Sequence, residues 1–233
     1  MGWRGEGAQH QGARGYQEDS WALRTLADGA LVAVLADGMG GHAGGAVASR
    51  LAVGAFLMAI ENGGSLADAL DAANRAVGEA ARRDAALQNM GSTLVAVTVK
   101  DDEVRWISVG DSPLYLVARG TLDRLNADHS MVPQIDALVA RGIISPEEAA
   151  RHPGRHTLRE AVMGQSLTLI DEGRRGLDQG DRLLVCSDGI ETLDHAAIVR
   201  AAAGPVRALI DAVLAVGAPA QDNVTVIKLE REG

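Results

Sequence analysis

Four aspartates occupy similar positions relative to the strands that the sequence predicts. Asp37, Asp111 and Asp188 each follow an apolar run, and Asp222 lies two residues before one. A fifth aspartate, Asp19, begins another predicted strand. Any one of them could be a turn residue. If the strand ends meet at one edge of a sheet, however, the carboxylates repel each other unless cations offset their charge. Mg²⁺ and Mn²⁺ prefer such oxygen ligands, and two ions roughly 3.5–4 Å apart commonly serve the hydrolysis of phosphate esters.

The clearest of these positions is the end of the run from Ala30 to Ala36, where Asp37 is followed by a glycine-rich turn. A continuous apolar run of this length predicts a strand buried on both faces. Helical spacing of apolar residues then predicts a helix over 45–60. The turn lacks the Gly-Lys-Ser/Thr of a P-loop and matches the Rossmann spacing only in part. A hard-cation site therefore fits this strand, turn and helix better than a nucleotide site.

The remaining elements must bring the other acids to the same edge. Alternating apolar spacing and turn signals predict further strands, and Ser65 followed by Asp68 predicts a helix start. Helices are expected over 65–87, 196–203 and 206–216, and strands over 1–12, 20–25, 92–100, 103–109, 114–118, 121–125, 181–186 and 224–229. Antiparallel strands with helices in two blocks predict an α+β fold, a four-layer α-β-β-α sandwich of two antiparallel sheets flanked by helices. We expect one domain over residues 1–233.

An irregular, more helical insert is expected over about 128–164. Ser145-Pro146-Glu147-Glu148 has the capping residue, proline and acids of a helix start. Around it lie His152, Arg155, His156 and Arg159, which make the insert locally basic. They are either solvated helix faces or contacts to a phosphorylated substrate, and we expect the insert to be a mobile flap.

Composition excludes several classes of function. The chain has 233 residues, 47% of them hydrophobic, and a net charge of −9, which disfavours binding to nucleic acid or anionic membranes. Cys186 is the only cysteine, so no intrachain disulfide can form, as is usual in a reducing cytosol. The apolar stretch Leu51–Ile60 is interrupted by Gly54 and is too short for a membrane span. No signal-peptide core is present, and we expect a cytoplasmic monomer.

Six motifs in order resemble the PPM (PP2C-type) family of metal-dependent protein Ser/Thr phosphatases, bacterial branch. The resemblance covers nearly the whole chain, from Gly12 to Leu229. The motifs are Arg14-x-x-Gln17-Glu18-Asp19, Ala36-Asp37-Gly38-Met39-Gly40-Gly41-His42, Val109-Gly110-Asp111-Ser112, Asp128-His129-Ser130, Cys186-Ser187-Asp188-Gly189 and Asp222-Asn223-Val224-Thr225. The insert also looks like the bacterial flap.

The resemblance implies a site for two Mn²⁺ or Mg²⁺ ions and possibly a third. Asp37 is implied to bridge two ions, with the Gly38 carbonyl on one of them, and Asp188 and Asp222 to hold the other. Asp111 is implied in the weaker third position.

Other residues are implied to act around these ions. Arg14 is implied to bind the substrate phosphate bidentately, and Glu18 and Asp19 to lie beside the metals through water. Ser130 of the flap is implied near the third position. A water bridging the metals is implied to attack phosphorus directly, so that no phosphoenzyme forms and Cys186, inside a buried strand, is not the nucleophile.

Three departures limit the transfer. Gln17 replaces the family's Asn. Pro113 stands where an Arg commonly follows Gly-Asp-Ser, which removes a charge and a backbone donor near Asp111. Met39 stands where animal members have a His proposed as general acid, and we do not transfer that role to His42.

The leading hypothesis is a phosphoprotein phosphatase that opposes a bacterial Ser/Thr kinase. One alternative is a partner-switch phosphatase that acts on an anti-sigma antagonist. Another is a catalytically silent PPM-like module that binds phosphoproteins. Retention of Asp37, Asp188 and Asp222 argues against the silent module.

Overall fold

Two antiparallel sheets form the centre of the molecule in the computed structural model, which describes residues 2–40 and 43–231. The first sheet has the order β1-β11-β10-β7-β8 and the second β2-β3-β5-β6-β9, with β4 paired to the end of β3. In the first sheet the strands are β1 (Trp3–His10), β7 (Leu114–Ala118), β8 (Thr121–Arg124), β10 (Arg182–Cys186) and β11 (Val224–Arg231). In the second they are β2 (Asp19–Thr25), β3 (Leu31–Met39), β4 (Gly91–Ser92), β5 (Leu94–Lys100), β6 (Glu103–Val109) and β9 (Asp171–Gly176).

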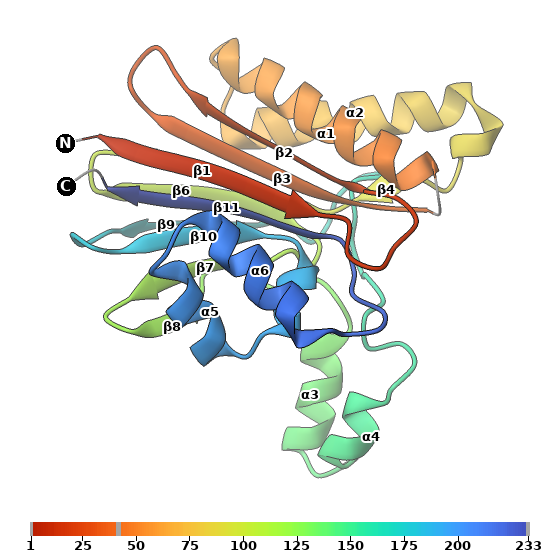
Figure 1. The fold of residues 1–233 in the computed structure, drawn as a ribbon. Helices are drawn as coiled ribbons and strands as arrows, with labels where there is room; N and C mark the ends of the chain where they lie inside the picture. The colour runs from red at the N-terminus through yellow and green to blue at the C-terminus, as the bar shows by residue number, and fades with distance from the viewer. Residues whose placement is uncertain (1, 41–42, 232–233) are drawn as a thin grey trace.

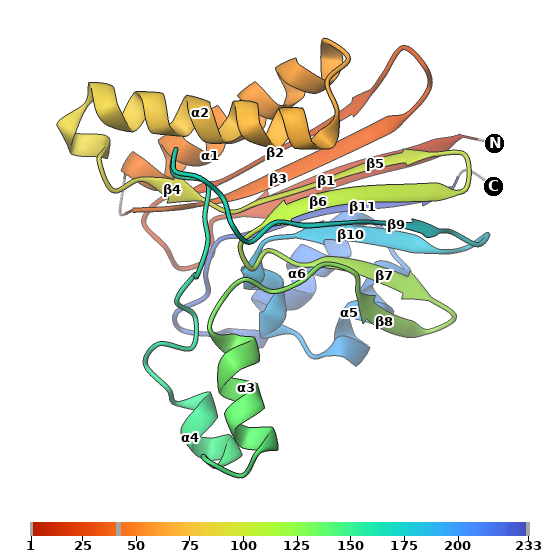
Figure 2. The same cartoon turned by 180° about the vertical axis from the view of Figure 1, so that it is seen from behind.

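Helices cover both outer faces of the sheet pair (Figure 1). On the second sheet lie α1 (Ala43–Glu61) and α2 (Leu66–Arg83), and on the first sheet α5 (His195–Ala202) and α6 (Val206–Val216). The α-β-β-α order predicted from the sequence is therefore confirmed. Two shorter helices, α3 (Val132–Ala140) and α4 (Pro146–Ala150), belong to the insert and project away from the sandwich (Figures 1 and 2).

Three apolar clusters hold these layers together. Leu35 and Val97 of the second sheet meet Leu116 and Leu183 of the first between the sheets. Other clusters lie under α1 and α2 and under α5 and α6. Strand β3 faces apolar neighbours on both sides, which explains its unbroken apolar run. The packing of its side chains on both faces holds the strand in place, and Asp37 lies near its C-terminal end.

The sequence did not predict strand β9. Its residues, DEGRRG, have no apolar alternation and are mostly exposed, because β9 is an edge strand held by backbone pairing to β6. Two other boundaries also differ from the prediction. Strand β3 runs two residues past Asp37 because β4 pairs with its end. The helix expected over 65–87 ends at Arg83, and Asp84 then caps a 3₁₀ turn over Ala85–Leu87.

Helix α1 begins two residues before and ends one residue after the predicted range of 45–60. By length and composition its segment Gly44–Glu61 could span a membrane, whereas the sequence analysis considered only the shorter apolar stretch Leu51–Ile60. Half of that segment is buried inside the protein, where Phe56 and Ile60 pack in the cluster under α1. Its apolar character is that of a core helix.

Candidate metal centre

The antiparallel pairing of β2 and β3 sets the first two carboxylates side by side. Asp19 is the direct partner of Asp37 in the register. The backbone of Asp37 is fixed from the other side by Thr93, which accepts the Asp37 N–H at its Oγ1 at 3.0 Å and donates its own N–H to the Asp37 carbonyl at 2.9 Å. Ser92 Oγ donates to the same carbonyl at 2.9 Å. The position of Asp37 is therefore held by three hydrogen bonds to its backbone.

Asp19 links the two sheets. Its Oδ2 accepts hydrogen bonds from Ser187 Oγ at 2.8 Å and from Thr225 Oγ1 at 2.6 Å, both on the first sheet's side. Its Oδ1 is buried without a hydrogen bond, and so is Oδ1 of Asp188. A buried carboxylate oxygen with no donor is costly. These two oxygens therefore point to a cationic ligand.

The electrostatics of the cluster lead to the same conclusion. Burial, followed by the charges of Asp19, Asp188, Asp111 and Asp222, raises the pKa of Asp37 well above its ordinary value. Burial and neighbouring aspartates raise the pKa of Asp188 to about 7 and that of Asp19 to about 6. The five aspartates predicted from strand ends are thus close enough to repel one another, and positive charge among them would relieve that repulsion.

The donor set fits Mn²⁺ or Mg²⁺. Hard cations of this size take carboxylate and carbonyl oxygens and keep several waters, so they need few protein ligands. Among the described residues no three His, Cys, Asp or Glu side chains form a ready-made ligand group. The carboxylates therefore suit ions that complete their shells with water, and they do not form a closed protein cage.

Two glycines allow the backbone to approach closely at this edge. A Cβ on Gly38 would lie 2.1 Å from the Gly45 carbonyl oxygen, and one on Gly189 would lie 2.1 Å from the Asn223 carbonyl oxygen. Any side chain at either position would push apart the segments that carry Asp37, Asp188 and Asp222. The glycines next to the acids in the sequence are thus required by packing.

Arg14 lies at the cluster on the loop between β1 and β2. Its Nη2 is 2.5 Å from Asp222 Oδ2, and both side chains are partly exposed. An exposed ion pair of this kind contributes little to stability, so Arg14 can exchange partners at low cost. The structure therefore places the predicted phosphate ligand beside a predicted metal ligand.

Asn223 positions that loop, a role that the sequence analysis did not identify. Its Oδ1 accepts the Glu18 N–H at 2.7 Å, and its Nδ2 donates to the carbonyls of Gln11 and Tyr16 at 2.8 and 2.9 Å. Glu18 lies close to the cluster, since a Cβ on Gly45 would come within 2.5 Å of its Oε1. The Asp-Asn pair of the last motif was the available signal.

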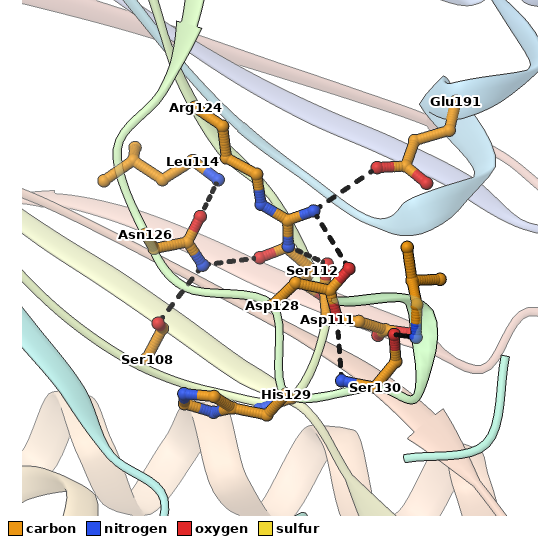
Figure 3. Close-up of polar contacts among 12 residues, drawn as sticks. Ser108, Asp111, Ser112, Leu114, Arg124, Asn126, Asp128, His129, Ser130 and Glu191 are labelled. Carbon is orange, nitrogen blue, oxygen red and sulfur yellow. Dashed lines mark hydrogen bonds and ion pairs between the residues drawn. The ribbon is translucent and has the colours of Figure 1, made fainter. Parts of the chain in front are cut away.

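Asp111 is tied to the root of the insert by Arg124, which sequence reasoning also missed (Figure 3). Arg124 Nη2 donates to the Asp111 carbonyl at 2.6 Å, and Nη1 lies 3.5 Å from Asp128 Oδ2 and 3.6 Å from Glu191 Oε1. Burial and the charge of Asp128 raise the pKa of Asp111 to about 6. Nothing in the spacing of the sequence signals Arg124, which lies on strand β8.

Buried Asn126 holds the same turn. Its Nδ2 donates to Ser108 Oγ at 3.1 Å and to the Ser112 carbonyl at 3.0 Å, while its Oδ1 accepts the Leu114 N–H at 2.8 Å (Figure 3). Two of these hydrogen bonds are made to the residues on either side of Pro113, which has no backbone N–H and cannot donate a hydrogen bond itself.

The remaining predicted residues are placed as follows. Ser130 is buried, pairs with Leu158 through an isolated bridge, and accepts the Val132 N–H at its Oγ, so its hydroxyl serves the start of α3. Cys186 is fully buried, and burial raises the pKa of its thiol, which confirms that it is a poor nucleophile. His42 lies outside the described residues.

A groove of about 830 Å³ lies at the other end of the sandwich beside Asp28, Glu61 and Trp106. It contains none of the clustered aspartates. This groove therefore does not overlap the candidate metal centre.

Comparisons with known proteins agree with this geometry. The model of the family described as protein phosphatase 2C matches residues 5–224. The chain is 38% identical over 213 residues to the serine/threonine protein phosphatase PstP of Mycobacterium tuberculosis, covering 85% of this chain and 40% of that protein. It is 33% identical over 190 residues to the serine/threonine phosphatase stp of Listeria welshimeri, covering 77% of this chain and 74% of that one.

A solved structure extends the comparison to the metals. The catalytic domain of the serine/threonine protein phosphatase PstP, crystallised with two manganese ions, superposes with a TM-score of 0.80 at 30% identity and covers 98% of this chain and 97% of that chain. The chain thus spans about 40% of the length of the full PstP sequence and nearly all of its catalytic domain.

Proposed function

This chain belongs to the protein phosphatase 2C family, and we propose that it hydrolyses phosphoserine and phosphothreonine in proteins with divalent metal ions. The observation that carries the proposal is the group of mutually repelling carboxylates, Asp19, Asp37, Asp111, Asp188 and Asp222, at one edge of the sandwich. Such a group is unfavourable by itself and becomes favourable when it holds cations.

Asp37 and the Gly38 carbonyl would bind one ion, with Asp37 shared by the second. Asp188 and Asp222 would hold that second ion, and Asp111 a weaker third one. When bound, Mn²⁺ or Mg²⁺ supplies a water of lowered pKa and offsets charge on the phosphoryl oxygens. The two manganese ions in the structure of the PstP catalytic domain favour Mn²⁺ for the test.

The chain's own residues then bind and orient the substrate. Arg14, partly exposed beside Asp222, would leave that carboxylate to bind two phosphoryl oxygens with its planar guanidinium. Asp19 and Glu18 would orient waters around the ions. Asn223 keeps the Arg14 loop against the cluster by its three hydrogen bonds. We place the reaction in the cytoplasm, opposing a Ser/Thr kinase.

The test is hydrolysis of a phosphothreonine peptide with Mn²⁺, with EDTA, and by the Asp37→Asn variant. We expect activity only with Mn²⁺, and a loss of at least about a hundredfold in the variant because a ligand shared by both ions is gone. Asp71→Asn, at an exposed position on α2, is the matched control. Full activity in EDTA would contradict the mechanism, and no activity in Mn²⁺ would contradict the function.

A further inference from the structure

Strand β2 is an edge of the second sheet, and half of its backbone groups point away from that sheet. Asp37 directs its N–H and carbonyl to Thr93, on the side away from β2. Since antiparallel pairs alternate, β3 is bonded to Ser20, Ala22 and Arg24 and not to the residues between them. The Gly38 N–H donates a hydrogen bond to the Glu18 carbonyl at 3.2 Å. This bond fits the alternation, because Glu18 lies two residues before Ser20.

Trp21 and Leu23 therefore present their backbone to the outer edge. The Leu23 carbonyl is taken by Arg24 Nη1 at 2.9 Å. In the part of the chain that the structure describes, the N–H groups of Trp21 and Leu23 and the Trp21 carbonyl have no hydrogen-bond partner, so they form a row that an added strand can use. Exposed strand edges of this kind are templates for pairing with another polypeptide.

A groove of about 560 Å³ runs along this edge and begins at the carboxylate cluster. Gln17 and Asp19 lie at its catalytic end, and Arg24 lies at the other. Helix α1 forms its wall with Arg50, Val53, Gly54 and Leu57. Gly54 has open space where a side chain would be, which leaves room for a neighbouring chain. In Figure 1 β2 runs alongside β3 and below α1.

The groove has a positive charge on a protein of net charge −9. Among the described residues that line it, the charged ones are Asp19, Arg24 and Arg50. The Asp19 carboxylate is turned into the cluster, where it bonds Ser187 and Thr225. Arg50 is exposed and pairs with no carboxylate in the described parts of the chain, and Arg24 has only a loose pair with Glu61 at 3.8 Å.

We propose that this β2 groove binds the polypeptide that flanks the phosphorylated residue of a substrate, as an added strand carrying acidic side chains. The proposal rests on the function proposed above and names the substrate class of the same site. A strand advances about 3.3 Å per residue. Acidic side chains roughly two to six positions from the phosphorylated residue would therefore face Arg50 and Arg24, while the peptide backbone pairs with Trp21 and Leu23.

The charge part is tested with two phosphothreonine peptides, one with flanking glutamates and one with glutamines at the same positions, and with p-nitrophenyl phosphate. For Arg50→Glu we expect the KM of the glutamate peptide to rise about fivefold or more, with kcat unchanged. The glutamine peptide and p-nitrophenyl phosphate should be unaffected. Arg75→Glu, exposed on α2 outside the groove, is the matched control.

The strand part is tested with the glutamate peptide N-methylated at alternate amides. Two peptides are compared, one methylated at the odd-numbered amides and one at the even-numbered amides. Only every second amide faces the β2 edge, so one of the two peptides should bind at least about tenfold more weakly and the other should bind normally. Equal effects of the two methylation patterns, or equal behaviour of Arg50→Glu and Arg75→Glu, would overturn the proposal.

A direct binding measurement separates this proposal from the proposed function. Fluorescence anisotropy of the unphosphorylated glutamate peptide in EDTA requires no hydrolysis, and it should still distinguish Arg50→Glu from wild type. Hydrolysis of p-nitrophenyl phosphate in Mn²⁺ without such peptide binding would refute the docking groove alone. Peptide binding without any hydrolysis would refute the phosphatase activity alone. Arg50→Gln, which keeps the helix face polar, repeats the test if the charge reversal fails to fold.

Discussion

Replacing Asp188 by Asn should stabilise the metal-free protein, although it removes a residue of the proposed centre. Burial and neighbouring aspartates raise the pKa of Asp188 from 3.8 to about 7 in the folded protein. A carboxyl group with a raised pKa contributes its full stability below the unfolded value, and that stability is lost as the pH rises through the folded value. Near pH 8 the Asp188 carboxylate is ionised in both states. Its charge is less favourable in the folded protein than in the unfolded chain, so it lowers the free energy of unfolding.

The size of the effect follows from the two pKa values. At about pH 8 the charge on Asp188 costs up to about 4 kcal/mol, and at about pH 5, where the folded group is largely protonated, about 2 kcal/mol. Asparagine keeps the shape and removes the charge. In EDTA we expect the Asp188→Asn variant to be more stable than wild type by most of these amounts, and the advantage should shrink as the pH falls.

Urea unfolding followed by tryptophan fluorescence measures this, since the chain has three tryptophans. With Mn²⁺ at about a hundred times its dissociation constant, wild type should gain about 3 kcal/mol, and the variant should gain much less. The stability advantage of the variant at pH 8 should therefore largely disappear on adding metal. Asp71→Asn serves as the exposed control and should change little.

A variant that is less stable than wild type in EDTA at pH 8 would refute the reasoning. It would mean that Asp188 is held by favourable contacts in the folded protein and is not opposed by neighbouring charge. A stability difference that does not change with pH would be equally damaging.

Three further outcomes are expected. Arg124→Ala should lower the free energy of unfolding by about 1–3 kcal/mol. The substitution removes the guanidinium that pairs with Asp128 and that donates a hydrogen bond to the Asp111 carbonyl. Faster amide hydrogen exchange over 128–164 would locate the effect, and unchanged exchange there would argue against it. Lys228→Met should cost about 2 kcal/mol by urea unfolding, since Lys228 is 3% exposed and its ammonium donates to the Gly204 carbonyl at 2.7 Å. Gly78→Ala, although favourable for an isolated helix, should lower the melting temperature, because its Cβ would lie 2.4 Å from the Cα of Gly164. A higher melting temperature would contradict that packing.

Much of the fold could be predicted from local patterns. The unbroken apolar run of β3 indicates a strand buried on both faces, and it lies between apolar clusters on both sides. Capping boxes at Ser65 and Ser145 predict the starts of α2 and α4, and the structure has both. These signals are readable because capping, turn geometry and apolar periodicity involve residues close together in the chain.

Strand β9 could not be predicted in this way. Its polar sequence has no buried face, so its conformation comes from the backbone of β6 beside it. For β9 the deciding neighbour therefore lies far away in the sequence. Helix α1, in contrast, was predicted to within two residues at each end, because its apolar spacing is a local signal.

In the candidate centre, too, some features could be predicted from the sequence and others could not. The sequence alone determined that Asp37, Asp111, Asp188 and Asp222 lie next to strand ends beside small residues, and that this is a pattern for cations. Only the tertiary structure decided that Asp19 faces Asp37 across the β2–β3 pair, that Asn223 anchors the Arg14 loop, and that Arg124 joins Asp111 to the insert. The physical reason is that repulsion, desolvation and hydrogen bonds depend on distances of a few ångströms. Sheet pairing and sandwich packing fix those distances even between residues 206 positions apart.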